Sequence, residues 1–398
     1  MKGKTVLIGV CGSVAAYKTA GLVSRLIKSG AEVHVIMTKN AVNFINPITF
    51  ESLTKTKCIT DTFDRNFNFD IEHISLAQKA DVCLIAPASA NIIGKIANGI
   101  ADDMLSTTVM ACKCKCLLAP AMNTNMYENQ IVQDNLKKLV NYGWEIIEPA
   151  SGRLACGDVG KGKLADEAVL FEAIEKETAY EKDLAGRRVL VTCGATCEAI
   201  YPVRFITNHS TGTMGVELAR AAYLRGAEVT LISGRREAEV PSYIEPIDVV
   251  NAADMFDAVK ENFEKNDILI KAAAVADYTP VTVSDNKIKK KDGEMSIELK
   301  RTEDILKYIG KNKGSRFICG FSMETENMLE NSKKKLEAKN ADMIVANNVK
   351  IDGAGFGKYT NIVTIITKNG NKELPLLTKT ETAHRILDEI VQNLDTNL

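Results

Sequence analysis

Short apolar runs alternate with amphipathic stretches along the chain. The first half predicts strands at residues 4–10, 32–37, 81–86 and 115–119. Helical patterns lie between them, and the helix expected over 14–28 ends at Ser29-Gly30, where a glycine usually stops a helix. Strands that alternate with helices favour a parallel sheet covered by helices on both faces.

The pattern restarts in the second half after a break near residue 186. A charged helical stretch over 171–182 precedes the break, and a β-branched strand pattern follows it. The second half predicts strands at residues 189–192, 268–273, 317–320 and 343–346, a hairpin of 361–367 and 373–377 around Asn369-Gly370, and a last helix over 378–393. We therefore expect two doubly wound, Rossmann-like, three-layer α/β domains, residues 1–186 and 187–398.

Composition narrows the class of protein. The 398 residues are 45% hydrophobic and 25% charged, which is typical of globular chains. The net charge of -1 lacks the basic excess of a general nucleic-acid binder. The apolar runs are too short to cross a bilayer, and the start of the chain lacks the features of a signal peptide. We therefore expect a cytoplasmic protein with no membrane or nucleic-acid partner.

The ten cysteines form no disulfide framework in the sequence. Their spacing is unpaired and several fall inside expected strands, which favours reduced thiols. Cys112, Cys114 and Cys116 could suggest a metal site. Their alternation, without a nearby histidine or second cysteine pair, favours an ordinary strand instead.

Ligands of doubly wound sheets bind beyond the carboxyl ends of the strands, so the loops there are candidate sites. The first loop contains Gly12, which lets the backbone approach a ligand, and Ser13, which can bind a phosphate or cap the next helix. Thr38 follows the second strand and is either a phosphate donor or a turn residue. The first loop is not a G-x-G-x-x-G motif, which argues against a nicotinamide dinucleotide.

Two later strand ends carry proline, small residues and amides. They contain Ser89 and Asn91 after one strand and Asn123 after the next, and amides there can bind a carboxylate or the polar edge of a ring. His73 is the only histidine near these loops and is a candidate acid–base group, although a lone histidine is more often structural. Cys156 lies in a glycine-rich segment, which suits a mobile flap with a reactive or proton-donating thiol.

Together these motifs resemble the flavin-dependent cysteine decarboxylases, in particular the phosphopantothenoylcysteine decarboxylase part of the bacterial bifunctional coenzyme A enzymes. The matching segments are, in order, GSVAAYK, the His73 motif, PASAN, NGIADD, PAMNTNM and LACG. The resemblance implies an FMN site that includes Gly12, Ser13, Thr38, Ser89 and Asn91. It also implies that His73 is catalytic, that Asn123 holds the substrate carboxylate and that Cys156 donates a proton. Tyr127 replaces the usual tryptophan of the family, a conservative change.

The second half has its own candidate loops. The segment 193–215 is polar and precedes a helix, so it can wrap a phosphate and a carboxyl-bearing substrate, with Asn208 as a useful side chain. Asp277 ends a strand of small residues and can accept a hydrogen bond from a base or a ribose.

Basic residues follow these loops. Lys287 opens a basic run that is either a solvated face or a neutraliser of triphosphate charge. Lys335 and Lys339 lie one helical turn apart, as a second phosphate clamp would require, although spacing alone favours a solvated face.

This half resembles phosphopantothenate–cysteine ligase over PVRFITNHSTGTMG, AAVADY, KIKK and the Lys335–Lys339 pair. The bacterial branch implies CTP with Mg2+, whose protein ligands the sequence does not identify. It also implies activation of 4'-phosphopantothenate as an acyl-cytidylate, a step stabilised by Asn208, and attack by the amine of cysteine. The implied CTP contacts are Lys271, Ala272, Ala273, Asp277, Lys287, Thr302, Glu303, Asp304, Ile305, Phe321, Lys335 and Lys339. The sequence departs from the family at Cys193-Gly194-Ala195-Thr196, at Tyr201 and at Thr302-Glu303, which bear on nucleotide contacts.

We therefore expect a bifunctional enzyme that makes phosphopantothenoylcysteine and decarboxylates it to 4'-phosphopantetheine. A peptide-cysteine decarboxylase or a flavin prenyltransferase would leave the second half unexplained. A non-catalytic regulatory flavoprotein would typically carry long acidic or disordered extensions, which this sequence lacks. The resemblance also implies a homo-oligomer, a dodecamer built from trimers of the decarboxylase domain and dimers of the ligase domain.

Overall fold

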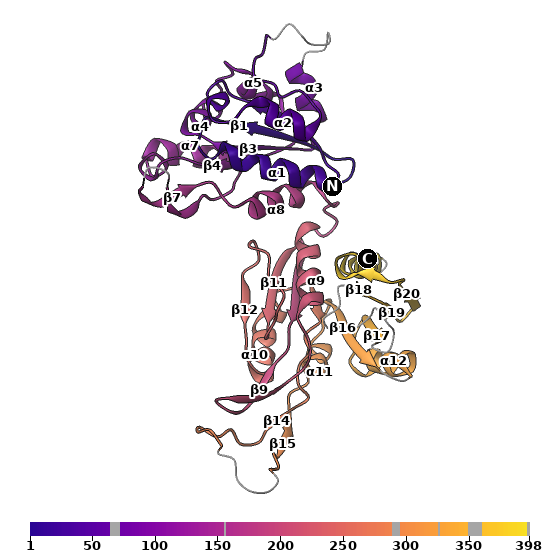
Figure 1. Cartoon of the computed structure of the whole chain (residues 1–398). Helices are drawn as coiled ribbons and strands as arrows, with labels where there is room; N and C mark the ends of the chain where they lie inside the picture. Colours follow the sequence, from indigo (N-terminus) through magenta and orange to yellow (C-terminus); the bar gives the residue numbers. More distant parts are fainter. Residues whose placement is uncertain (64–71, 155–156, 289–294, 325–326, 349–359, 396–398) are drawn as a thin grey trace. The chain divides into compact units, whose positions relative to one another are not determined.

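The computed structural model describes residues 1–63, 72–154, 157–288, 295–324, 327–348 and 360–395. Its contacts divide the chain into two compact units, Met1–Tyr180 and Glu181–Leu398 (Figure 1). The segment 181–186 packs on the second unit, because Lys182 Nζ donates to Leu224 O at 2.7 Å and Leu184 is buried. The contacts thus separate the units at Tyr180, a few residues before the division expected at 186.

The first unit is built on a parallel sheet of five strands in the order β2-β1-β3-β4-β5. The strands are β1 (Thr5–Val10), β2 (Glu32–Met37), β3 (Val82–Ala88), β4 (Lys115–Pro120) and β5 (Glu145–Ile146). The helices are α1 (Ala16–Lys28), the 3-10 helix η1 (Ala41–Asn43), α2 (Pro47–Thr54), α3 (Glu72–Lys79), α4 (Ala90–Ala97), α5 (Met104–Ala111), α6 (Thr124–Tyr127), α7 (Gln130–Asn141) and α8 (Glu167–Thr178). An antiparallel ribbon of β6 (Ala150–Arg153) and β7 (Val159–Lys163) follows β5.

Successive side chains of β1 enter two different cores. Val6 and Ile8 pack with residues of α1 and α8, whereas Leu7 packs with residues of α4, α5 and α7. This alternation is the two-residue period of a strand whose two faces are both covered. It confirms the predicted three-layer arrangement, which Figure 1 shows as helices on both sides of the sheet.

The second unit has an eight-stranded sheet in the order β12-β11-β8-β13-β16-β17-β19-β20. The first six strands in this order run parallel to one another, and β19 pairs antiparallel with both β17 and β20. The strands are β8 (Arg188–Cys193), β11 (Glu228–Ser233), β12 (Pro246–Asp248), β13 (Ile268–Lys271), β16 (Phe317–Glu324), β17 (Met343–Asn348), β19 (Val363–Thr367) and β20 (Gly370–Glu373). The helices are α9 (Thr213–Leu224), α10 (Ala252–Phe263), α11 (Ile305–Lys311), α12 (Met328–Ala338) and α13 (Lys379–Asp395). Val189 and Leu190 of β8 again enter opposite cores.

Three short antiparallel ribbons complete this unit. They are β9 (Cys197–Tyr201) with β10 (Arg204–Thr207), β14 (Tyr278–Pro280) with β15 (Leu299–Arg301), and β18 (Thr360–Asn361) with β21 (Leu377–Thr378). The predicted polar loop over 193–215 is therefore partly a β-hairpin, because the apolar Phe205 and Ile206 sit in a strand.

Other local predictions are also wrong. The second strand of the C-terminal hairpin is Gly370–Glu373 instead of 373–377, because a two-residue turn leads directly into Gly370. The helix expected over 171–182 is α8, which ends at Thr178. Cys112 and Cys114 are not on a strand, since α5 ends just before Cys112. Among the described residues, no helix is long and apolar enough to cross a membrane.

Candidate active sites

The strand order of the first unit reverses between β1 and β3, and ligands of such sheets bind where the loops diverge at this switch point. Gly12 and Ser13 follow β1, while Ser89 and Asn91 follow β3. The N–H of Cys11 donates to Pro87 O at 3.2 Å and joins the two loops. The fold therefore brings four of the predicted FMN residues to one edge of the sheet.

Gly12 is required by a close approach of two loops. A Cβ atom there would lie 2.7 Å from the Cβ of Asn40, which is closer than real contacts allow. Thr38 leads into the same Asn40 loop, and its N–H donates to Val10 O at 2.9 Å. The fifth predicted FMN residue thus lies beside the loop that follows β1.

The helix ends at this edge suit an anion. In the described part of this unit, the first turns of α1 and α4 contain no acidic residue, and α1 has no side-chain cap. Ser89 caps α4 by accepting from Ile92 N at 3.5 Å. Positive helix ends with small hydroxyl residues fit a phosphate group, and the tight glycine loop leaves the backbone open to a flat ring. These residues fit FMN.

His73 lies in the first turn of α3 and is half-buried. α3 precedes β3 in the chain and packs against α5. The catalytic role of His73 stays a prediction.

Asn123 caps α6 and uses both ends of its amide. Its Oδ1 accepts from Asn125 N at 2.9 Å, and its Nδ2 donates to Asp158 Oδ2 at 3.0 Å. Asp158 closes the tip of the β6–β7 ribbon, where its carbonyl accepts from Leu154 N at 2.8 Å. Cys156, the predicted proton donor, lies outside the described residues.

Two glycines let the ribbon touch this loop. A Cβ on Gly162 would lie 2.3 Å from Met122 O, and one on Gly160 would lie 2.6 Å from Thr124 Oγ1. Met122 N donates to Gly162 O at 3.0 Å across the contact. Gly160 and Gly162 thus allow the backbone of β7 to approach the Asn123 loop.

The second unit has the strand order 3-2-1-4-5-6 in β12-β11-β8-β13-β16-β17, with its switch point between β8 and β13. The loops after these strands are tied together at Ala274 O, which accepts from Thr196 N at 3.3 Å and from Asn208 Nδ2 at 3.0 Å. Because its amide nitrogen is used in this way, Asn208 presents its oxygen elsewhere. Asn208 is exposed at the edge of the sheet where the loops after β8 and β13 meet.

A cavity of about 750 Å³ lies at the same edge of this sheet. It is lined by eight of the predicted CTP residues: Lys271, Asp277, Thr302, Glu303, Asp304, Ile305, Lys335 and Lys339. Thr302 links the segment before α11 to the segment after β13. The Thr302 hydroxyl donates to Ala276 O at 2.6 Å, and the Thr302 N–H donates to Asp277 O at 3.0 Å. Six basic and three acidic residues line the cavity, an excess that favours a polyanion.

The lysines of the cavity are held in defined positions. Lys339 Nζ pairs with Asp304 Oδ2 at 2.5 Å, and Lys335 Nζ donates to Phe321 O at 3.1 Å. Burial raises the pKa of the Asp304 carboxyl, but its hydrogen bonds to Lys339 and to the N–H of Lys307 outweigh burial and lower the pKa. Burial, together with the nearby charge of Lys335, lowers the pKa of Lys271 to about 8.

Some predicted residues are absent from the cavity lining. Ala272 and Ala273 follow β13. Phe321 lies in β16, and its carbonyl oxygen accepts the hydrogen bond from Lys335 Nζ. Lys287 is exposed in the segment after β14, and the rest of its basic run lies largely outside the described residues.

Sequence reasoning missed other residues that line the cavity: Tyr278, Arg301, Lys307, Tyr308 and Lys311. Lys307 and Lys311 share a helix face with Asp304 by their spacing, which could have indicated them. Within the described residues, no group of three or more histidine, cysteine or acidic side chains could hold a metal ion.

The two switch-point sites define a two-domain α/β protein in which each domain has its own ligand site. Residues 1–179 match the family model "Flavoprotein", and residues 184–394 match "DNA/pantothenate metabolism flavoprotein C-terminal domain". The chain is 49% identical to the coenzyme A biosynthesis bifunctional protein CoaBC of Bacillus subtilis (strain 168), over 98% of this chain and 97% of the relative. It is 41% identical to the protein of the same name from Haemophilus influenzae, over the full length of both.

Solved structures include the C-terminal domain of a CoaBC protein, at 43% identity and a TM-score of 0.47, covering 54% of this chain and 100% of that one. They also include the FMN binding protein AtHal3, at 33% identity and a TM-score of 0.39, covering 44% of this chain and 95% of that one. The chain belongs to the family of bifunctional coenzyme A biosynthesis proteins. The prediction of a bifunctional enzyme, with a flavoprotein decarboxylase domain followed by a ligase domain, is confirmed.

Proposed function

We propose that the second unit joins 4'-phosphopantothenate to cysteine with CTP, and that the first unit decarboxylates the product with FMN. The observation that carries the proposal is the pair of switch-point sites on one chain, one with uncharged loops at two helix ends and one with a lysine-rich cavity. A peptide-cysteine decarboxylase or a regulatory flavoprotein would not need the second cavity.

In the ligase site, the cavity lysines neutralise the triphosphate of CTP while the substrate carboxylate attacks the α-phosphorus, the bond between the α- and β-phosphates breaks and pyrophosphate leaves. Asn208 turns its amide oxygen away from Ala274 O and is positioned beside the substrate carboxyl as the acyl-cytidylate forms. The amine of cysteine then displaces the cytidylate. Mg2+ enters with CTP, because Mg2+ is usually bound through substrate phosphates and few protein oxygens.

In the decarboxylase site, FMN supplies the reversible oxidation at the substrate thiol that makes loss of CO2 feasible. Gly12, Ser13, Thr38, Ser89 and Asn91 would hold it. His73 moves a proton at the substrate, and Asn123 orients the carboxylate that leaves. Cys156 returns a proton to the product in this proposal. Both reactions take place in the cytoplasm in this proposal.

The test uses the purified chain with 4'-phosphopantothenate, cysteine and CTP·Mg2+, and follows pyrophosphate and CO2. We expect both products and a flavin spectrum. Pyrophosphate without CO2 would contradict the assignment of the first unit. A flavin spectrum with neither product would favour the regulatory or alternative-substrate functions.

Two variants separate the sites. Asn208→Asp replaces the amide donor to Ala274 O by a carboxylate that repels both this carbonyl and the substrate, so pyrophosphate release should stop. His73→Asn keeps a polar side chain but removes the imidazole ring that would move the proton, so CO2 release should stop. With phosphopantothenoylcysteine supplied directly, Asn208→Asp should still release CO2, and His73→Asn should still release pyrophosphate from CTP. Loss of both activities in either folded variant would contradict the two-site assignment.

We also propose that the chain assembles from trimers of the first unit and dimers of the second. Large exposed apolar side chains support subunit contacts on both units, with Tyr17 and Ile48 on the first and Val203 and Phe205 on the second. Light scattering on the purified protein should give a dodecamer, and a monomer would contradict this assembly.

A further inference from the structure

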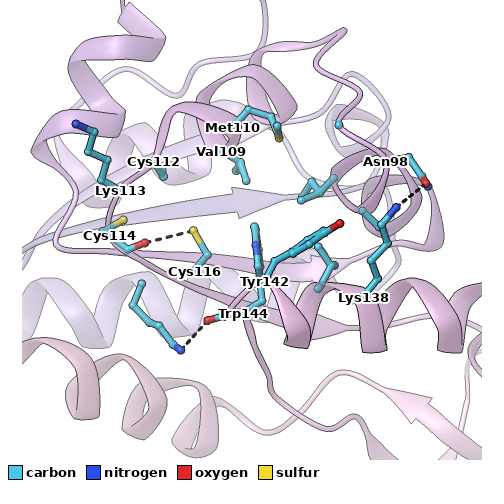
Figure 2. Close-up of a pocket in the computed structure, with 16 residues that line it drawn as sticks. Asn98, Val109, Met110, Cys112, Lys113, Cys114, Cys116, Lys138, Tyr142 and Trp144 are labelled. Atoms are coloured by element: carbon cyan, nitrogen blue, oxygen red, sulfur yellow. Dashed lines mark hydrogen bonds between the residues drawn. The ribbon is translucent and has the colours of Figure 1, made fainter.

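A second cavity lies in the first unit, at the edge of the sheet opposite the predicted FMN residues. It has a volume of about 830 Å³ and is lined by the start of β4 and the ends of α4, α5 and α7 (Figure 2). FMN and its substrate belong at the carboxyl edge, so the proposed function does not use this cavity.

Four thiols gather at this cavity. Cys112, Cys114 and Cys116 line it, and Cys83 pairs with Cys116 in the register of β3 and β4. Cys116 Sγ lies 3.6 Å from Cys114 O, the contact drawn in Figure 2. Cys112 and Cys114 are half-buried, whereas Cys83 and Cys116 lie in the core. Two thiols are therefore open to the cavity, with two more behind them.

Cys112 lines the cavity, is half-buried, and is the thiol of this cluster whose pKa is lowered. The side chains of Cys114, Cys116 and Cys83 hydrogen-bond to it, and these bonds lower the pKa of Cys112 well below its ordinary value although burial opposes them. The carboxyl end of α5 beside Cys112 also disfavours a negative charge, so the thiol donors must outweigh it. In contrast, burial raises the pKa of Cys58 to about 12, outside this cluster.

The cavity around the thiols is cationic. Among the described residues, its lining contains Lys113, Lys115 and Lys138 and no acidic side chain. Lys115 Nζ donates to Gly143 O at 2.7 Å and Lys138 Nζ to Asn98 Oδ1 at 3.3 Å, which fixes two of these charges in the wall of the cavity. A thiolate among lysines favours a reaction partner that is itself anionic.

We propose that this cavity is a site of reversible S-thiolation, at which Cys112 exchanges with a small anionic disulfide. The Cys112 thiolate attacks one sulfur of the disulfide, a Cys112 S–S bond forms, and the original S–S bond breaks. The second half of the disulfide leaves as a thiolate and takes a proton from water. The protein sulfur is oxidised and the leaving thiol is reduced, so no further oxidant is needed.

The test uses the reduced full-length protein with oxidised glutathione as the anionic probe. Samples are quenched with acid at early times, before neighbouring thiols displace the adduct, and the modified peptides are mapped by mass spectrometry. We expect Cys112 to carry glutathione before any other described cysteine. Cys112→Ser should abolish this early adduct, and the matched Cys58→Ser should leave it unchanged. An early adduct at another described cysteine, with Cys112 unmodified, would overturn the proposal even if Cys112→Ser fails to fold.

The charge of the probe tests the role of the lysines. Cystamine has the same disulfide but a positive charge, so it should modify Cys112 roughly tenfold more slowly than oxidised glutathione at low salt. Lys113→Gln combined with Lys138→Gln should reduce this difference, and added salt should do the same in the unaltered protein. Equal rates with both probes would overturn the anionic specificity.

Discussion

Lys271 lines the ligase cavity, and its burial lowers the pKa of its side chain. It ends β13 at the switch point and faces Lys335 and Lys339, which are held by Phe321 O and Asp304. Burial and the neighbouring lysine charge both favour its neutral form, and the nearby acids oppose them only in part. A bound triphosphate would favour the charged form, so the state of this side chain should control how CTP binds.

We predict that kcat/KM for CTP falls as the pH rises through about 8. The pKa of Lys271 is lowered to about 8, so the side chain is charged below this pH and loses its charge above it. The decline should approach about tenfold per pH unit in the free enzyme. Single-turnover pyrophosphate formation without cysteine measures this step and avoids the titration of the cysteine amine.

Arginine variants provide the control for this pH dependence. Lys271→Arg keeps a permanent charge, so its decline near pH 8 should disappear even if its overall rate is lower. Lys311→Arg, at another position in the cavity lining, should keep the decline. A decline that is unchanged in Lys271→Arg would show that another group titrates.

At the residue scale, motifs predicted the candidate site better than periodicity did. The segments around Asp277 and Asp304 were indicated by their resemblance to a family, and the fold brings both to one cavity. The use of the Asn208 amide by Ala274 O could not be predicted, because these residues are far apart in the sequence. Cys112 was assigned to a strand because an alternating pattern does not show where the preceding helix ends.

At the scale of elements, the glycines of the β6–β7 ribbon allow it to pack against residues 122–124, the loop that contains Asn123. Its sequence predicted a flap, because glycine-rich segments commonly form loops. The structure pairs Ala150–Arg153 with Val159–Lys163 and packs β7 against residues 122–124. The requirement for glycine at 160 and 162 comes from this packing, which only the three-dimensional arrangement reveals.

We predict that Gly162→Ala reduces decarboxylation by roughly tenfold to a hundredfold, because displacing a substrate-positioning loop by about 1 Å has effects of this size. The new Cβ would lie 2.3 Å from Met122 O and push the Asn123 loop away from the ribbon. CO2 release from phosphopantothenoylcysteine measures the effect, and pyrophosphate release by the second unit should not change.

Gly152→Ala is the matched control on the same ribbon. Gly152 has φ +150, close to φ +147 at Gly162, but a Cβ at 152 would meet nothing within 4 Å. Both variants therefore carry a similar backbone strain, and only Gly162→Ala adds the clash. Equal losses of decarboxylation in the two variants would refute the role of the close approach.

At the scale of the whole molecule, the sequence predicted the fold class and the existence of two units. It did not predict the strand orders, which place the sites at switch points, because the order depends on how each helix crosses the sheet. The boundary was placed at a local break in the pattern near residue 186. The residues before this break belong to the second unit through long-range contacts that no local pattern contains.

Arg225 makes the most important of these contacts. Its guanidinium is buried and pairs with Asp183 in the segment before the break and with Asp388 in α13. The N–H of Leu184 also donates to Arg225 O at 3.0 Å, and the Leu184 side chain is buried in the core of the second unit. Removing residues 181–186 would leave the Arg225 charge with one carboxylate instead of two and open the core at Leu184.

We therefore predict that the position of a split decides whether the second unit remains stable. A fragment starting at Glu181 keeps these contacts, whereas one starting at Arg187 loses them and should be less stable by about 2–3 kcal/mol, the size expected from losing a buried leucine side chain. Urea unfolding of the two fragments measures the difference, and pyrophosphate release checks their sites. Asp183→Asn in the longer fragment removes the charge but keeps the segment and Leu184, so it should lose only part of this stability. Equal stability of both fragments would show that the second unit begins at 187, as the sequence pattern alone suggested.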